Sequence, residues 1–304
     1  RVKELAPAAA IVGPSHYHYD GWTSWDMDSG SAYSTAGDGR WFMDDFLARV
    51  RSASDARGAR LLDTWDFHWY PQHQSNDAYV WALDDSVRPL TPEEIQHVVQ
   101  SPRSYWDHEY DEDSWITRDH LKGPTFILER LRQRIDTAYP GTKLGVSEYF
   151  PGGCAHIASG LGVADSLGVF ARMGVHLAAM WPACKRLEYA FGAIRLFRNA
   201  DGKGLRFADT SVRVTHPERR ESSVHAGSDD PKRVTVVVIN KTTAERRVGL
   251  RLFHPERLAR VASYRIDAEH PSPHPAGDEE LARTNAHAYV APPLSATLLV
   301  FDDV

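Results

Sequence analysis

Cysteine, basic charge and long apolar runs are all scarce in this sequence of 304 residues. Its two cysteines, Cys154 and Cys184, are too few for a disulfide framework. We expect two free thiols, with one bridge between them as the alternative. Lysine and arginine number 35 against 41 acidic residues, so the net charge is −6. Nucleic-acid binding, which requires a basic excess to neutralise phosphates, is therefore not expected, and no run of apolar residues is long enough to predict a transmembrane helix.

Tryptophan is absent from the C-terminal part of the chain. All nine tryptophans lie between Trp22 and Trp181. Strand and helix patterns alternate up to this point, whereas short β-branched segments separated by turn residues follow it. The change in composition predicts a boundary between two domains, which we place at residues 1–202 and 203–304.

The first domain is predicted to be an α/β structure. Strands are expected at residues 10–14, 61–71, 144–148 and 175–181. Helices are expected at residues 41–59, 126–139, 156–173 and 187–197, with long loops at 15–40 and 72–122. This alternation predicts parallel strands with right-handed crossovers. A complete eight-stranded barrel takes about 250 residues, so the pattern indicates roughly half of a TIM-like barrel.

The second domain is predicted to be an all-β sandwich. Strands are expected at residues 205–214, 222–227, 233–240, 246–253, 260–267, 286–291 and 295–301, with a proline-rich loop at 271–275. The apolar residues between Val234 and Ile239 occupy both alternating positions. We therefore expect that strand to be buried on both faces.

Glu148 is the candidate catalytic residue. It follows the apolar run Leu144–Val146 and precedes an aromatic, glycine-rich loop. In a parallel barrel, catalytic groups lie at the carboxyl ends of strands. Hydrolysis of a glycosidic bond uses two carboxylates, one as acid and the other as nucleophile or base. Glu148 fits one of these roles, and an ordinary surface or capping glutamate is the alternative.

Polar and aromatic residues alternate in the stretch Asp66-Phe67-His68-Trp69-Tyr70. Side chains alternate along a strand, so Asp66, His68 and Tyr70 should share one face. They could hydrogen-bond sugar hydroxyls or orient Glu148. A buried polar network with no ligand is the alternative.

Seven tryptophans lie in expected loops or at strand ends, where their indoles could stack on the apolar faces of sugar rings. They are Trp22, Trp25, Trp69, Trp81, Trp106, Trp115 and Trp181. Packing of the long loops is the alternative for several of them. Trp181, at the end of the fourth strand, is the best candidate for the floor of a sugar site.

Other catalytic patterns are weak. The spacing of His16, His18 and Asp20 could ligate a metal ion, but no further ligand is close in sequence. Cys154 and His156 resemble a nucleophile pair, although adjacent sequence is not adjacent geometry. The common nucleophile-elbow, phosphate-loop, zinc-protease and dinucleotide motifs are absent.

The sequence resembles glycoside hydrolase family 44, which contains endo-acting β-1,4-glucanases and xyloglucanases. The resemblance is collinear and runs through nearly the whole chain. Its residues are Leu62-Asp63, His68-Trp69-Tyr70-Pro71, 110–116, 139–144, Glu148-Tyr149, Gly152-Gly153, His156-Ile157, 189–199, 201–204 and 209–212. One departure is Phe150-Pro151, where the family has Asn-Tyr, and it leaves the substrate preference open.

The resemblance implies a barrel joined to a sandwich and a retaining mechanism with Glu148 as nucleophile at the end of barrel strand 7. The four strands would be strands 5 to 8. The family's acid/base lies in an Asn-Glu-Pro context that this sequence lacks. We therefore expect it upstream of Arg1, and expect the chain alone to be inactive or nearly so.

The implied ligand is a β-glucan held by His68, Trp69, Tyr70, Tyr149, Trp181, Trp115 and Trp22. The resemblance further implies an extracellular protein, monomeric at full length, without an organic cofactor. A structural calcium ion is compatible with this interpretation, but the sequence does not locate one. A non-catalytic glycan-binding protein and a barrel glycosidase of another specificity are the rival hypotheses.

Overall fold

The computed structural model describes residues 1–25, 39–75 and 78–303. The chain divides into two compact units, each made of three separate segments. The first unit contains residues 1–70, 104–150 and 173–181, and the second contains 71–103, 151–172 and 182–304. Trp25 belongs to the described residues, whereas most of the loop predicted at 15–40 lies outside them.

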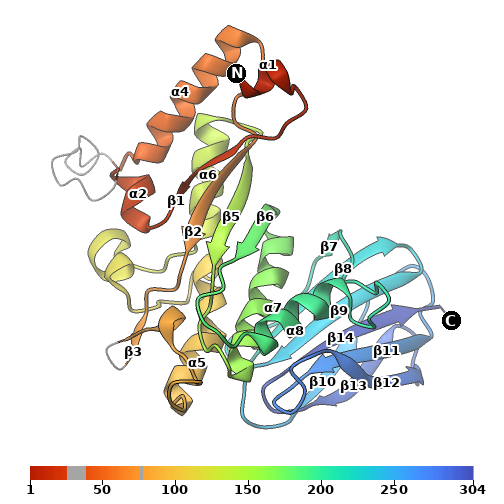
Figure 1. Ribbon diagram of the computed structural model, residues 1–304. Helices are drawn as coiled ribbons and strands as arrows, with labels where there is room; N and C mark the ends of the chain where they lie inside the picture. Colours follow the sequence, from red (N-terminus) through yellow and green to blue (C-terminus); the bar gives the residue numbers. More distant parts are fainter. Residues whose placement is uncertain (26–38, 76–77, 304) are drawn as a thin grey trace. The chain divides into compact units, whose positions relative to one another are not determined.

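A parallel sheet of four strands is the centre of the first unit (Figure 1). Its order is β1-β2-β5-β6, and all three neighbouring pairs are parallel. The strands are β1 (Val12–His16), β2 (Thr64–Trp69), β5 (Lys143–Tyr149) and β6 (Val175–Met180). The predicted parallel α/β arrangement is thereby confirmed, and the assignment to barrel strands 5 to 8 stays a prediction.

Helices accompany this sheet in the same unit. They are α1 (Val2–Leu5), α2 (Tyr19–Thr23), α4 (Phe42–Arg57), the π-helix η3 (Ile116–Leu121) and α6 (Ile127–Ala138). Helix α6 buries Leu128, Leu131 and Ile135, at the helical spacing that predicted it. Helix α4 ends at Gly58, whose left-handed conformation (φ of 62°) favours glycine.

Antiparallel sheets dominate the second unit. The larger sheet has the order β12-β11-β14-β9-β8-β7, and β10 pairs with β13 in a two-stranded sheet. The strands are β7 (Ser211–Val212), β8 (Ser222–Asp230), β9 (Arg233–Asn240), β10 (Arg246–Arg251), β11 (Arg260–Ile266), β12 (His274–Glu280), β13 (Ala286–Ala291) and β14 (Ser295–Asp302). A short hairpin, β3 (Gln74–Ser75) with β4 (Ala78–Tyr79), also belongs here.

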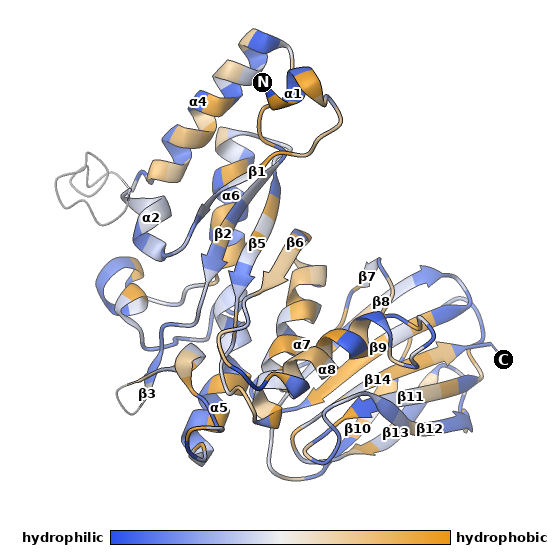
Figure 2. Cartoon of the chain, in the orientation of Figure 1, coloured by the Kyte–Doolittle hydropathy of each residue, from blue (hydrophilic) through white to orange (hydrophobic). Residues whose placement is uncertain are grey.

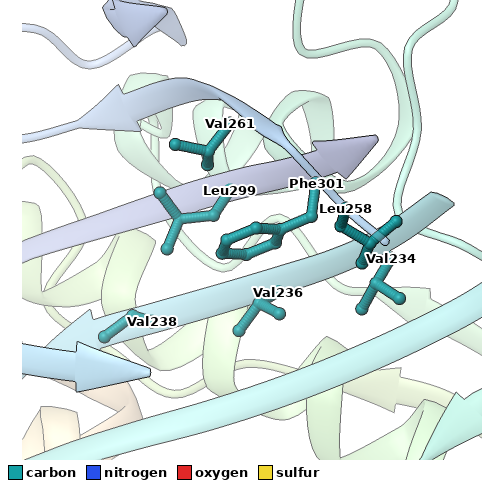
Figure 3. Close-up of a cluster of buried hydrophobic side chains, with 7 residues drawn as sticks. All are labelled: Val234, Val236, Val238, Leu258, Val261, Leu299 and Phe301. Atoms are coloured by element: carbon teal, nitrogen blue, oxygen red, sulfur yellow. The ribbon is translucent and has the colours of Figure 1, made fainter. Parts of the chain in front are cut away.

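Apolar residues cover both faces of the larger sheet. Figure 3 shows one buried cluster, formed by Val234, Val236, Val238, Leu258, Val261, Leu299 and Phe301. Partly buried residues of β10 and β13 pack against this cluster. The opposite face is covered by α7 (Ile157–Arg172) and α8 (Glu188–Arg198), and Figure 2 shows the apolar character of α7. Strand β9 is therefore buried on both faces, as its sequence predicts.

Several elements differ from the sequence prediction. Helix α5 (Pro92–Gln100) and the 3₁₀ turns η1 (Val80–Ala82) and η2 (Ser101–Tyr105) lie in the expected loop 72–122. Strand β12 begins inside the expected loop 271–275, and only the two residues of β7 are strand within 205–214. The two compact units also cut the chain differently from the predicted boundary at residue 202, which stays a prediction about barrel and sandwich.

The expectation of free thiols is wrong, because Cys154 and Cys184 form a disulfide in the second unit. Their Cα atoms lie 6.0 Å apart, within the range that a bridge spans. The two cysteines are 30 residues apart in the sequence, so no local pattern indicated that they are neighbours in the fold.

In the described part of the chain, the helices are too short or too polar to span a membrane.

Candidate active site

Glu148 lies at the carboxyl end of β5, beside Tyr70, which directly follows β2. The Tyr70 hydroxyl donates to Glu148 Oε2 at 2.8 Å. His68 Nδ1 lies 3.1 Å from the same oxygen. The Glu148 side chain keeps 27% of its surface exposed, so a ligand can reach it. Two of the three residues predicted to share one face thus meet at the candidate nucleophile.

A β-bulge positions Glu148. Phe67 pairs with Val146, whereas the next residue, His68, pairs with Glu148, so Ser147 is an extra residue in β5. Bulges re-aim side chains and are common next to active sites. The bulge sets Glu148 directly opposite His68 across the parallel pair. The alternation rule alone does not predict this register.

The protonation states of Tyr70 and His68 follow from burial and from the Glu148 charge. Burial, together with the hydrogen bond and charge of Glu148, raises the pKa of Tyr70 well above its usual range. The phenol therefore stays protonated and donates. Burial lowers the pKa of His68, and the opposing effect of the Glu148 and Asp66 charges is smaller. The imidazole is thus neutral at pH 7.

Asp66 is the third residue of the predicted face. In the described part of the chain, its side chain is hydrogen-bonded to Ser15 and not to Glu148. Its carboxylate accepts bonds from the backbone N–H and the hydroxyl of Ser15. Ser15 is an extra residue in β1 and has a φ of 62°. Sequence reasoning missed Ser15, because a bulge in a short strand leaves no pattern. Asp66 is buried and acts as the negative charge beside His68.

Trp181 is the aromatic side chain best placed to contact a ligand. It directly follows β6, and its backbone N–H donates to the carbonyl of Tyr149, the residue after Glu148. Half of its surface (50%) is exposed. The backbone of Trp181 is therefore next to that of the candidate nucleophile, and its role as the floor of a sugar site stays a prediction.

Other predicted ligand-binding residues are in the interior. Trp22 is 0% exposed, and Trp69 and Tyr149 are each 2% exposed. Trp22 packs against the ring of Phe67, and Trp69 donates its indole N–H to Ser104 Oγ at 3.0 Å. A ligand has no open face to contact on these side chains, so they support the site from within. Trp115 is half-buried, with its ring 5.9 Å from that of Tyr19.

The weaker sequence patterns do not form reactive sites. Cys154 has no thiol, because it is bridged to Cys184, and so it cannot pair with His156 as a nucleophile. His18 caps α2 by accepting the N–H of Gly21 at Nδ1. Among the described residues, the groups of possible metal ligands that lie close together do not include His16, His18 and Asp20.

Comparison by sequence relates the chain to known glycosidases. The family model "Glycoside hydrolase family 44" matches residues 1–73. Endoglucanase A of Paenibacillus lautus is 34% identical over 247 residues, which are 79% of this chain and 34% of that protein. Beta-mannanase/endoglucanase A of Caldicellulosiruptor saccharolyticus is 30% identical over 308 residues, which are 96% of this chain and 22% of that protein.

Comparison by structure extends the similarity to the whole chain. A Paenibacillus polymyxa family 44 xyloglucanase, solved with xyloglucan, superposes with a TM-score of 0.91 at 30% identity. The match covers 99% of this chain and 58% of that one. The chain thus spans about a third or less of the two curated relatives and a little over half of this solved structure.

Proposed function

Because this chain belongs to glycoside hydrolase family 44, we propose that it acts in the hydrolysis of internal β-1,4-glucosidic bonds of cellulose-type glucans or xyloglucan. The observation that carries the proposal is the position of Glu148, a partly exposed carboxylate at the end of a parallel strand that accepts a hydrogen bond from Tyr70 at 2.8 Å. The names of the relatives supply the substrate class, and one of them was solved with xyloglucan.

The proposed reaction is a double displacement. Glu148 attacks the anomeric carbon while the bond to the leaving oxygen breaks, which forms a glycosyl-enzyme. Tyr70 holds Oε2 and thereby orients Oε1 towards the sugar. An acid protonates the leaving oxygen and later deprotonates the water that releases the product. We place this acid/base outside residues 1–304, because they contain no Asn-Glu-Pro sequence. The reaction needs no organic cofactor.

Substrate contacts are proposed for the exposed or half-buried residues of the predicted set. Trp181 offers an exposed indole for stacking on a pyranose ring. Tyr70 and His68 border the carboxylate and can approach the hydroxyl groups of the sugar bound there. Trp115 is proposed for a more distant part of a glucan chain.

The nucleophile is tested with a reagent that needs little help from an acid. A 2-deoxy-2-fluoro-β-cellobioside with a dinitrophenolate leaving group should form a stable ester with the 304-residue chain. Peptide mass spectrometry should find the label on Glu148. The Glu148→Gln variant, whose side chain is nearly isosteric, should remain unlabelled.

Each rival hypothesis has its own outcome in this experiment. A label on another carboxylate would refute Glu148 as the nucleophile. Binding of cellobiose by a folded chain that is never labelled would favour the non-catalytic glycan-binding protein. Faster labelling by a mannose-derived or xylose-derived reagent than by the glucose-derived one would favour a glycosidase of another specificity.

We also propose that the protein is extracellular and acts as a monomer at full length. Polysaccharides of this class are too large to enter cells intact. The Cys154–Cys184 disulfide supports the location, because such bridges persist mainly in oxidising compartments. Size-exclusion chromatography with light scattering would test the oligomeric state.

A further inference from the structure

Three side chains with good metal-binding donors meet in the connection from β11 to β12, within the second unit. They are Asp267, His270 and His274. One donor atom from each lies within 4.8 Å of the other two. His270 Nδ1 is 2.9 Å from Asp267 Oδ1, and His274 Nε2 is 3.7 Å from Asp267 Oδ2. The spacing Asp-x-x-His-x-x-x-His places two of them in the loop after β11 and the third, His274, at the first residue of β12.

The donor set and its dimensions fit a small divalent transition metal. Zinc binds imidazole nitrogen and carboxylate oxygen at about 2.0–2.2 Å, so ligand atoms in a tetrahedral site are about 3.3 Å apart. Each imidazole lies close to one oxygen of the Asp267 carboxylate, at 2.9 Å from Oδ1 for His270 and 3.7 Å from Oδ2 for His274, so small movements of the side chains would bring one donor from each residue to this spacing. Calcium and magnesium prefer oxygen ligands, and two imidazoles disfavour them. His270 is 51% exposed, which leaves room for a water ligand.

The carboxylate is already oriented by its neighbours. Asp267 Oδ1 accepts the backbone N–H groups of Glu269 and His270, and Oδ2 accepts Arg265 Nε at 3.0 Å. Hydrogen bonds of this kind hold a ligating carboxylate in position around a metal. The positive charge of Arg265 opposes cation binding, which points to a site of modest affinity.

Helix α8 anchors the loop and so reduces the entropy lost when a metal binds. The Tyr189 hydroxyl donates to the carbonyl of Ala268 at 2.6 Å, and Arg195 donates to Ser272 Oγ at 3.3 Å. Gly192 lets the loop approach closely, because a Cβ there would be 1.7 Å from the carbonyl oxygen of Pro271. The three ligands therefore sit on a loop fixed at several points.

We propose that Asp267, His270 and His274 form a surface site for Zn²⁺ or a similar late first-row divalent cation. The three residues belong to the second compact unit, whereas Glu148 belongs to the first. Its occupation is expected to raise stability by mass action, because the unfolded chain does not hold the three ligands together. The proposal does not depend on the hydrolase function.

Calorimetric titration of the tag-free 304-residue chain with ZnCl₂ tests the site. We expect one Zn²⁺ per chain, an upward shift of Tm with Zn²⁺ and no matching shift with Ca²⁺. The variants His270→Ala and His274→Ala should each weaken binding at least about tenfold. His254→Ala, which removes an imidazole from another loop of the same unit, should bind as the parent does.

Cobalt provides an independent spectroscopic measurement. Co²⁺ bound by the chain should give visible absorption bands that Zn²⁺ abolishes and that His274→Ala lacks, with far-UV circular dichroism as the check that the variant is folded. Unchanged Zn²⁺ affinity in both folded histidine variants, or equal affinity for Ca²⁺, would overturn the proposal.

Discussion

The Glu148 carboxylate is surrounded by groups that bind it without neutralising it. Tyr70 is a neutral donor, and His68 is held neutral by burial. A cation in either place would stabilise the carboxylate but would weaken it as a nucleophile. A protonated phenol can instead give up part of its hydrogen bond as charge moves onto the sugar.

Removing the Tyr70 hydroxyl should slow formation of the glycosyl-enzyme. A hydrogen bond to a charged group contributes about 1.5–3 kcal/mol, so we expect Tyr70→Phe to lower the labelling rate roughly 10- to 100-fold. Stopped-flow detection of the released dinitrophenolate measures this rate. Tyr17→Phe, at a tyrosine that is 61% exposed, is the matched control. Equal rates for Tyr70→Phe and the parent would exclude an orienting role.

At the scale of single residues, the sequence indicates which side chains could react or bind better than it indicates which of them are exposed to solvent. Residue type and strand position marked Glu148, His68 and Tyr70 as candidates, and in the structure these three side chains lie together. Trp22 and Trp69 were assigned to a ligand, yet both are buried. Whether such an indole is buried or exposed depends on which ring or hydroxyl packs against it in the fold, and no local sequence pattern contains that information.

Individual elements were predicted where their pattern was long and were missed where it was short. Helix α5 was assigned to a loop, although Thr91 and Glu94 form a capping box around Pro92. That signal was available in the sequence. Strand β12 had no such signal, because its mainly polar residues pair only along one side, with β11.

A buried charge network joins α7 to the larger antiparallel sheet. Asp165 is 2% exposed, and its oxygens lie 2.6 Å from Lys241 Nζ and 2.8 Å from His225 Nε2. The Ser223 hydroxyl donates a hydrogen bond to Asp165 Oδ2 at 3.0 Å. Burial alone would raise the pKa of Asp165, but Lys241 and His225 hold it far below its usual range.

Breaking this network should cost much of the stability of the second unit. Asp165→Asn leaves the Lys241 charge buried without its partner, so we expect a loss of about 3–5 kcal/mol in the free energy of unfolding. Urea denaturation at pH 7 measures the change. Asp136→Asn, at an exposed position of α6, should stay within about 0.5 kcal/mol of the parent.

The same network predicts a pH dependence. The folded pKa of Asp165 is lowered, so its stabilisation is complete above the unfolded pKa of about 4 and is lost as the pH falls below it. The stability difference between the parent and Asp165→Asn should therefore narrow below about pH 4. A difference that stays constant down to pH 3 would contradict the lowered pKa.

At the scale of the whole molecule, the helices α7 and α8 were predicted close to their observed bounds, but the sheet on which they pack was not predicted. Their periodicity indicated an apolar face, and we placed both helices in the first predicted domain, residues 1–202. In the structure they pack on β8, β9, β11 and β14. Periodicity shows that a helix buries one side, but it does not say which sheet receives it.

This packing predicts that residues 203–304 do not fold well alone. Without α7 and α8, one face of the larger sheet would expose buried side chains such as Val237, Ile239 and Leu298. We expect the fragment to bind a hydrophobic dye and to aggregate, in contrast to the 304-residue chain. A monomeric fragment with a cooperative and reversible thermal transition would contradict this expectation.

The division of the chain into six alternating segments has a consequence for how such a protein can change. Each unit is assembled from three stretches, so the backbone passes from one unit to the other five times. A single genetic crossover cannot exchange one unit for that of a homologue, because the fragments on either side of any cut contain parts of both. We therefore expect an exchange of one whole unit of this chain with that of a homologue to require changes at several junctions at once.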